Sequence, residues 1–232
     1  MVALVLLPGL DGTGLLFDEF AAALGSDADV IIASYPVQKL LGYAELESIA
    51  RSFIPSANPF FLLGESFSGP IALSIAASPP PNLLGVILCC SFARNPLPML
   101  APARVLLRHL PVAPPVSLLN FFLLGRFSTE KLRTRLARVL AMVAPEVLRE
   151  RALAALSVDE STRLGHVRAP LLYLRARQDR VVGRRSAEQI LAGVPDAQML
   201  EFAAPHFLLQ VIPEACAATV SEFMRAHTTK SP

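Results

Sequence analysis

The sequence predicts an α/β protein in which a six-stranded, mainly parallel sheet is flanked by helices. Short apolar runs of strand length alternate along the chain with longer stretches of helical periodicity, which is the pattern of βαβ units. The composition agrees, because 53% of the 232 residues are hydrophobic and only 17% are charged. Parallel strands that are covered on both faces are almost continuously apolar, so they account for this balance.

Six apolar runs are expected to form the strands, at residues 2–7, 30–35, 59–64, 83–90, 169–177 and 196–202. Two of these runs end at a proline, the first at Pro8 and the second at Pro36. Helices are expected between and after the strands, near residues 15–24, 43–54, 66–77, 184–192 and 207–226. Strands that alternate with helices imply right-handed crossovers between parallel neighbours.

The segment from residue 92 to residue 168 interrupts this alternation. It begins with several prolines and continues as helix, without a convincing strand. One helix has an apolar face made of Leu132, Leu136, Val139, Leu140 and Val143. We therefore expect residues 1–91 and 169–232 to form one α/β core, and residues 92–168 to be a helical insertion between the fourth and fifth strands.

Several classes of protein are disfavoured by composition. A membrane-spanning helix needs about 20 uninterrupted apolar residues. The longest candidate, residues 103–127, is broken by Arg108, His109, Pro111, Pro114 and Pro115. The first residues lack the basic segment and cleavage site of a signal peptide. A net charge of +2 argues against a nucleic-acid binder.

The cysteine and histidine patterns predict neither a disulfide framework nor a metal site. The chain has three cysteines and four histidines, with no CxxC or HExxH motif and no cluster of histidines. We expect a reducing compartment, the cytoplasm, and no metal or other cofactor. The adjacent Cys89 and Cys90 are expected to be small buried hydrophobic residues at the end of the fourth strand.

The segment GESFSG, residues 64–69, is close to the G-x-S-x-G turn of a nucleophilic serine. Ser66 has Gly64 two residues before it, but Ser68 stands where the second glycine is usual, and Gly69 follows. The expected strand before the turn and helix after it are the setting that this motif requires. The alternative is an ordinary Gly/Ser turn. We expect Ser68 to be a small packed residue, so that Ser68→Gly is nearly silent for activity.

A nucleophilic serine needs a base, and His206 is the candidate. His206 follows the sixth strand, as Ser66 follows the third, and the carboxyl ends of parallel strands meet at one edge of a sheet. His109 and His166 belong to the insertion or its border, and His227 lies in the C-terminal tail. The alternative is that His206 is a capping or surface histidine.

Asp179 is the candidate acid that would orient the base. It follows the fifth strand and lies between Ser66 and His206 in chain order. Asp159 and Glu160 come before that strand, and Asp196 comes before the sixth, at the opposite edge. The alternatives for Asp179 are a helix cap or an ion pair with a neighbouring arginine.

Two backbone N–H groups are expected to stabilise an oxyanion. One belongs to Phe67, directly after the serine, and the other to Leu10 in the glycine-rich loop PGLDGTG, residues 8–14. The alternative for this loop is a phosphate-binding turn. Its glycine spacing differs from GxGxxG, and it contains no basic residue.

Four segments, PGLDGTG, GESFSG, RARQDRVV and APHFLLQ in that order, resemble the α/β-hydrolase superfamily and specifically its serine esterase and lipase branch. The resemblance implies Ser66 as nucleophile, Asp179 as acid and His206 as base. It implies Leu10 and Phe67 as the oxyanion hole.

The resemblance covers nearly the whole chain apart from residues 92–168, which fall where that family places its variable cap. It implies the spatial strand order 2-1-3-4-5-6, without the two leading antiparallel strands common in the family. Pro8 stands where many relatives have histidine. Because only the backbone donates there, the implied site is unaffected.

These features predict a hydrolase that cleaves a small-molecule carboxylic ester through an acyl-enzyme. The apolar residues 98–107 and 116–127 would roof the site and favour an apolar acyl or alcohol group, although ordinary packing explains many of them. Basic residues at 131, 133, 135 and 138 are expected on a solvated helix face.

Two other readings of the site remain open. An acyltransferase or thioesterase would use the same fold, and PGLDGTG and GESFSG also resemble the hydrolase-like half of plant phytyl-ester acyltransferases. A binding protein of low turnover would keep the same residues.

Overall fold

The computed structural model describes residues 2–100 and 115–228. Six strands form one sheet in the order β2-β1-β3-β4-β5-β6, and all neighbouring pairs are parallel. The strands are β1 (Ala3–Leu7), β2 (Asp29–Ile32), β3 (Phe60–Glu65), β4 (Leu83–Cys89), β5 (Leu171–Ala176) and β6 (Gln198–Phe202). The predicted fold class and strand order are therefore confirmed.

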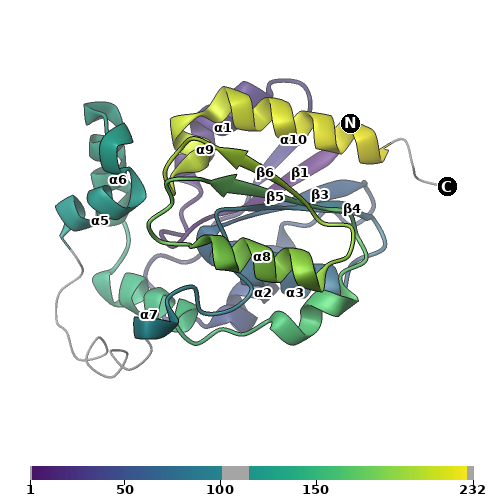
Figure 1. The fold of residues 1–232 in the computed structure, drawn as a ribbon, viewed down its shortest axis with the longest axis horizontal. Coiled ribbons are helices and arrows are strands. Elements are labelled where there is room, and N and C mark those ends of the chain that lie inside the picture. The colour runs from purple at the N-terminus through teal and green to yellow at the C-terminus, as the bar shows by residue number, and fades with distance from the viewer. Residues whose placement is uncertain (1, 101–114, 229–232) are drawn as a thin grey trace.

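Helices cover both faces of the sheet (Figure 1). One layer contains α1 (Asp18–Leu24), α9 (Leu208–Val211) and α10 (Pro213–Thr228), and the other contains α2 (Tyr43–Ser52), α3 (Gly69–Ala77) and α8 (Arg184–Gly193). Successive strand residues point to opposite faces. Val5 and Leu62 accordingly pack into the core under α2, α3 and α8, and Leu4 and Leu63 into the core under α1 and α10. This double burial explains the continuous apolar runs of the sequence.

Two expected helices are divided in the structure. The helix expected near residues 207–226 ends as α9 at Val211, and α10 begins at Pro213, because proline has no N–H to continue the hydrogen-bond ladder and suits the first helical turn. The helix expected at 66–77 begins with a 3₁₀ turn, η2 (Ser66–Ser68), before α3. A similar 3₁₀ turn, η1 (Leu15–Phe17), precedes α1.

The regular elements of the insertion between β4 and β5 are helices in the part of the chain that the structure describes. Its elements are η3 (Pro98–Leu100), α5 (Val116–Leu123), η4 (Gly125–Phe127), α6 (Glu130–Ala141), α7 (Pro145–Ala155) and η5 (Ser161–His166). An antiparallel bridge between Arg94 and Asp159 joins its two ends. The expected roof segment 98–107 lies partly outside the described residues, as does His109.

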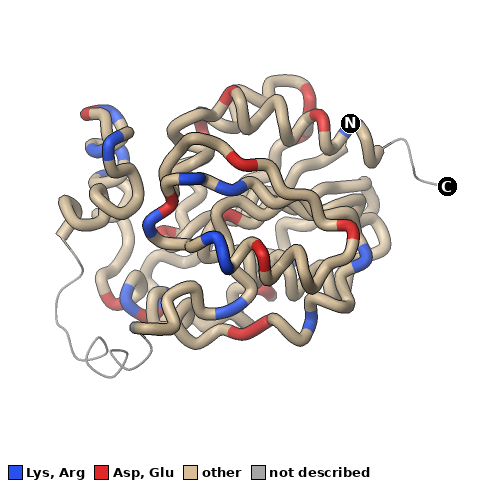
Figure 2. The backbone as a smooth tube through the Cα atoms, in the orientation of Figure 1, with Lys and Arg blue, Asp and Glu red and all other residues tan. Residues whose placement is uncertain are grey.

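Three basic residues of α6, Lys131, Arg133 and Arg138, are exposed as expected, whereas Arg135 is half-buried. Figure 2 shows Lys and Arg grouped on this helix. Lys131 lies 2.8 Å from Glu19, and Arg135 contacts both Asp18 and Glu19 at 2.9 and 3.2 Å, so they join α6 to α1. The Arg135 side chain is 18% exposed. Across residues 2–100 and 115–228, no helix has the length and apolarity needed to cross a membrane.

Candidate active site

The site begins at a strained turn after β3. Ser66 has φ = 47°, in the left-handed region that non-glycine residues rarely occupy. Gly64 makes room for this turn, because a Cβ at that position would lie 2.8 Å from the Ala72 Cβ and 2.9 Å from the Ser68 carbonyl oxygen. The Ser91 hydroxyl donates to the Ser66 carbonyl at 2.5 Å and so holds the strained peptide from the β4 side.

The structure brings Ser66, His206 and Asp179 into one hydrogen-bonded chain. The Ser66 Oγ lies 2.9 Å from the His206 Nε2, and the His206 Nδ1 lies 2.8 Å from the Asp179 Oδ2. The three residues follow β3, β6 and β5, so they meet at the carboxyl edge of the sheet. Asp159 instead accepts hydrogen bonds from Ser161, and Glu160 pairs with Arg163.

The other carboxylate oxygen of Asp179 is also occupied. The backbone N–H groups of Val181 and Val182 donate to the Asp179 Oδ1 at 2.8 Å each. Asp179 therefore both closes the turn before α8 and faces the imidazole. An acid that orients the base and a cap at the start of a helix were alternatives in the sequence analysis. With one oxygen fixed by the backbone, the carboxylate has one orientation toward His206.

His206 has a raised pKa although it is buried. The His206 and Asp179 side chains are only 4% and 3% exposed. Burial by itself lowers the pKa of His206, but the charge and hydrogen bond of Asp179 and the charge of Glu65 outweigh it. The pKa of His206 therefore lies above its ordinary value.

Glu65 is a buried acid that the sequence analysis missed. Burial raises its pKa to about 7, against opposing hydrogen bonds from Gln210 and the Gly9 backbone. The Gln210 Nε2 donates to Glu65 at 2.9 Å from α9, in the segment that follows His206. Glu65 directly precedes Ser66 in the sequence. This position was the only sequence feature that could have indicated a role for Glu65 in the site.

Ser68 does more than fill space. It is fully buried as expected, but its hydroxyl donates to the Pro8 carbonyl and lies 2.9 Å from the Tyr35 hydroxyl. These bonds join the turn after β3 to the loop after β1. The Ser68 side chain is thus packed as expected and also makes two hydrogen bonds that the sequence did not indicate, while a silent effect of Ser68→Gly on activity stays a prediction.

The loop 8–14 lies beside the Ser66 turn. An oxyanion hole made of the Leu10 and Phe67 N–H groups requires this arrangement. In the parallel register of β1 and β3, Leu7 is opposite Gly64, so Pro8 begins the loop next to Glu65. Phe67 is buried, and its ring stacks on the Tyr43 ring with 4.8 Å between the ring centroids. The Phe67 carbonyl accepts a hydrogen bond from the Tyr43 hydroxyl at 3.1 Å. Its backbone is thus fixed beside the serine.

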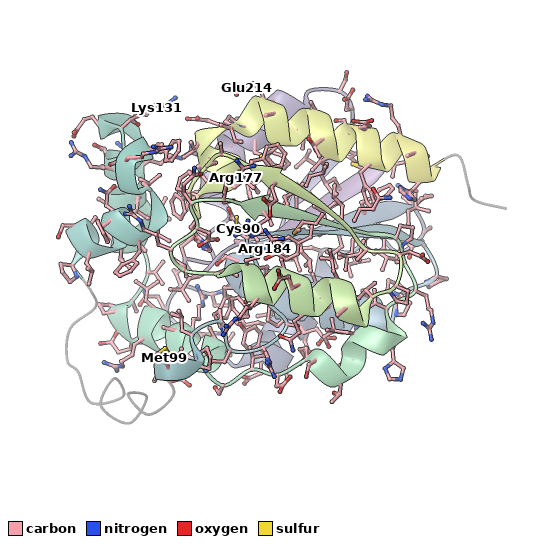
Figure 3. All side chains as sticks on the ribbon, in the orientation of Figure 1. Cys90, Met99, Lys131, Arg177, Arg184 and Glu214 are labelled. Atoms are coloured by element: carbon pink, nitrogen blue, oxygen red, sulfur yellow. The ribbon has the colours of Figure 1, made fainter. Side chains whose placement is uncertain are left out.

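Cys90 lies near this hydrogen-bonded chain. Both adjacent cysteines are buried as expected, and Cys90, labelled in Figure 3, has φ = 47°. Its sulfur lies within 4.8 Å of ligand atoms of Asp179 and His206. The loop after β6 brings His206 close to Cys90, a contact that the sequence did not indicate. These three side chains are also the one group among the described residues whose composition and spacing would suit a metal ion.

The Ser68 hydrogen bonds predict a coupled stability effect. Ser68→Ala would leave the Pro8 carbonyl and the buried Tyr35 hydroxyl without this partner, so we expect a loss of about 1–3 kcal/mol in the free energy of unfolding. Adding Tyr35→Phe should cost less than the sum of the two single changes. Urea unfolding of the wild type, the two single variants and the double variant measures this coupling. The exposed change Ser52→Ala is the control. Additive losses would show that the two hydroxyls are not coupled.

The charge of Glu65 predicts the direction of a pKa change in His206. Glu65→Gln removes a negative charge that stabilises the imidazolium, so the pKa of His206 should fall. An NMR titration of the His206 ring protons measures this, with Glu214→Gln, an exposed change on α10, as control. An unchanged or higher His206 pKa in Glu65→Gln would contradict the electrostatic account.

Comparison with known proteins identifies the family. A family model described as the alpha/beta hydrolase family matches residues 4–219. The chain is also similar to phytyl ester synthase 2, chloroplastic, of Arabidopsis thaliana, at 30% identity over 128 residues. That alignment covers 53% of this chain and 18% of the plant protein, so the chain spans less than a fifth of that relative.

Solved structures share the fold over almost the whole chain. An esterase from Exiguobacterium antarcticum has a TM-score of 0.81 at 14% identity, covering 97% of this chain and 92% of its own. An enol-lactonase from Burkholderia xenovorans LB400 has a TM-score of 0.81 at 16% identity, covering 97% and 91%. Such low identities show the fold and not the activity. The family match over residues 4–219 and the strand order together show that this chain belongs to the α/β-hydrolase family.

Proposed function

We propose that this chain is a serine hydrolase that cleaves carboxylic esters through an acyl-enzyme. The observation that carries the proposal is the position of His206, which lies within hydrogen-bond distance of both Ser66 and Asp179. A serine hydroxyl is a weak nucleophile, and this arrangement supplies the base that activates it and the acid that orients the base.

In the proposed reaction, the Ser66 Oγ attacks the ester carbonyl while the His206 Nε2 takes the hydroxyl proton. Asp179 holds the Nδ1–H tautomer of His206 and stabilises the imidazolium. The N–H groups of Leu10 and Phe67 donate to the oxyanion of the tetrahedral intermediate. The imidazolium then protonates the leaving alcohol, and an acyl group remains on Ser66.

Deacylation repeats these steps with water as the nucleophile. His206 takes a proton from water as the water oxygen adds to the acyl carbonyl. Collapse of the second intermediate then breaks the bond to the Ser66 Oγ, which takes the proton back from His206 as the carboxylic acid leaves. Ser66 is half-buried, whereas His206 and Asp179 are nearly enclosed, which suits a reaction in which the substrate reaches the serine alone.

We propose that residues 92–168 act as a cap that selects apolar esters. The cap helix α5 contacts both loops that carry the site, since Arg180 donates to the Phe121 carbonyl at 2.9 Å and the Phe207 N–H to the Leu123 carbonyl at 3.1 Å. A small pocket lies between cap and core. It is lined by Phe122, Leu124, Gly125, Arg126, Phe127, Gln178, Arg180 and Pro205.

Acyl transfer to an alcohol is the second candidate function. The observation that favours it is the similarity to a protein named phytyl ester synthase, although the alignment covers a small part of that protein. The acylation half of the reaction would be the same. The two functions differ in whether water or an alcohol accepts the acyl group from Ser66.

Ser66→Ala tests the proposal. We expect p-nitrophenyl ester turnover to fall at least about 1,000-fold, because the covalent intermediate cannot form. Thermal unfolding should remain cooperative, because the change removes one half-buried hydroxyl. The surface change Ser52→Ala, scored in parallel, should leave turnover unaltered.

The assay should include a panel of acyl lengths, with and without a long-chain alcohol. Ester formation that exceeds hydrolysis, and that is lost in Ser66→Ala, would select acyl transfer. Turnover that persists in Ser66→Ala would refute Ser66 as the nucleophile. No Ser66-dependent turnover of any ester in the panel would favour a binding protein.

A further inference from the structure

Five consecutive carbonyls in the loop after β1, those of residues 8–12, each accept a hydrogen bond. The Pro8 carbonyl accepts from Ser68, the Gly9 carbonyl from the Gly12 N–H at 3.1 Å, and the Gly12 carbonyl from the Tyr35 N–H at 2.7 Å. The Leu10 and Asp11 carbonyls accept from a single side chain, that of Arg151. This loop is therefore fixed from outside as well as by its own turn.

Arg151 reaches the loop from the insertion. It lies on α7 and is 2% exposed. Its Nη1 donates to the Leu10 carbonyl at 3.0 Å and to the Asp11 carbonyl at 2.7 Å, and its Nη2 donates to the Pro36 carbonyl at 3.1 Å. One guanidinium thus bonds the segments that follow both β1 and β2.

The guanidinium has close neighbours on two sides. Gly12 has φ = 72°, and a Cβ there would overlap the guanidinium. On another side the Arg151 Cζ lies 5.7 Å from the centroid of the Tyr35 ring. Burial lowers the pKa of Arg151, opposed by the negative charge of Asp11, but an arginine stays protonated in proteins, so the donors persist at every working pH.

The peptide that carries the Leu10 N–H lies between two anchored peptides. This unit consists of the Gly9 carbonyl and the Leu10 N–H. The peptide before it is held by Ser68 through the Pro8 carbonyl, and the peptide after it is held by Arg151 through the Leu10 carbonyl. The Leu10 N–H itself has no hydrogen-bond partner within residues 2–100 and 115–228. Its direction is therefore set by the Gly12 N–H on the Gly9 carbonyl of the same peptide and by the anchors on either side.

We infer that Arg151 is a positioning residue that aims the Leu10 N–H at the oxyanion, so that the helical insertion controls the oxyanion hole. The inference rests on the proposed function, since it presupposes that Leu10 donates to an oxyanion. Arg151 touches neither Ser66 nor His206 through any hydrogen bond in the described chain. Its effect on the reaction passes through the loop backbone.

Arg151→Met tests the inference because it keeps much of the side-chain volume and removes the donors. An oxyanion interaction is made in the transition state, so the loss should appear in kcat and leave KM within about threefold. We expect kcat to fall about 10- to 100-fold, which is less than the loss from deleting a donor outright. The affinity for an arylboronic acid, whose tetrahedral adduct on Ser66 presents an oxygen to the same donors, should fall by a similar factor.

Two further variants keep the test decisive. Arg151→Lys retains the charge but only one compact donor group, so its kcat should lie between those of the wild type and Arg151→Met. It also serves if Arg151→Met fails to fold. Arg138→Met, on the exposed face of α6, is the matched control and should leave kcat and boronate affinity unchanged. Circular dichroism and thermal unfolding confirm that each variant is folded at the assay temperature.

The outcomes separate this inference from the proposed function. A folded Arg151→Met with wild-type kcat and boronate affinity would overturn the positioning role, as would a loss confined to thermal stability. Either result leaves the proposed function intact, provided that Ser66→Ala is inactive. Turnover that survives in Ser66→Ala would instead overturn the function.

Discussion

The left-handed backbone of Ser66 is the constraint on which the rest of the site depends. A non-glycine residue in this conformation costs about 1–3 kcal/mol, so its surroundings must hold it there. The structure shows three supports: Gly64 leaves space under the turn, the Ser91 hydroxyl holds the Ser66 carbonyl, and Ser68 ties the turn to the loop after β1. The side chain is thereby presented at the carboxyl edge of the sheet, where the loops after β5 and β6 bring Asp179 and His206.

Several polar groups at this edge are buried beside an apolar sheet, and their hydrogen-bond partners also fix their orientation. Asp179 is held by two backbone N–H groups and His206, and Glu65 by Gln210. The same logic extends to the loop after β1, where Arg151 supplies from the insertion the donors that the core lacks. Hydrogen bonds therefore join the insertion to the core beside the candidate site, which is the physical basis for the proposed effect of the insertion on the oxyanion hole.

The sequence was sufficient to predict the sheet, because six apolar runs separated by helices leave few arrangements with right-handed crossovers. The candidate site was predictable for the same reason, since Ser66, Asp179 and His206 each follow a strand. The break before α10 was readable from Pro213 but was overlooked. Arg151 and Ser68 were not predictable, because hydrogen bonds from side chains to carbonyls 140 or 60 residues away leave no sequence pattern. Glu65 was not recognised for the same reason, since its hydrogen-bond donor is Gln210, 145 residues along the chain.

The central claim is that His206 activates Ser66, and covalent labelling with a fluorophosphonate tests it most directly. Peptide mass spectrometry should place one adduct per chain on Ser66 in the wild-type protein. The rate of labelling should fall by at least about 100-fold in His206→Ala, because the unassisted hydroxyl is a weak nucleophile. An adduct on any other residue, or an equal rate in His206→Ala, would contradict the account.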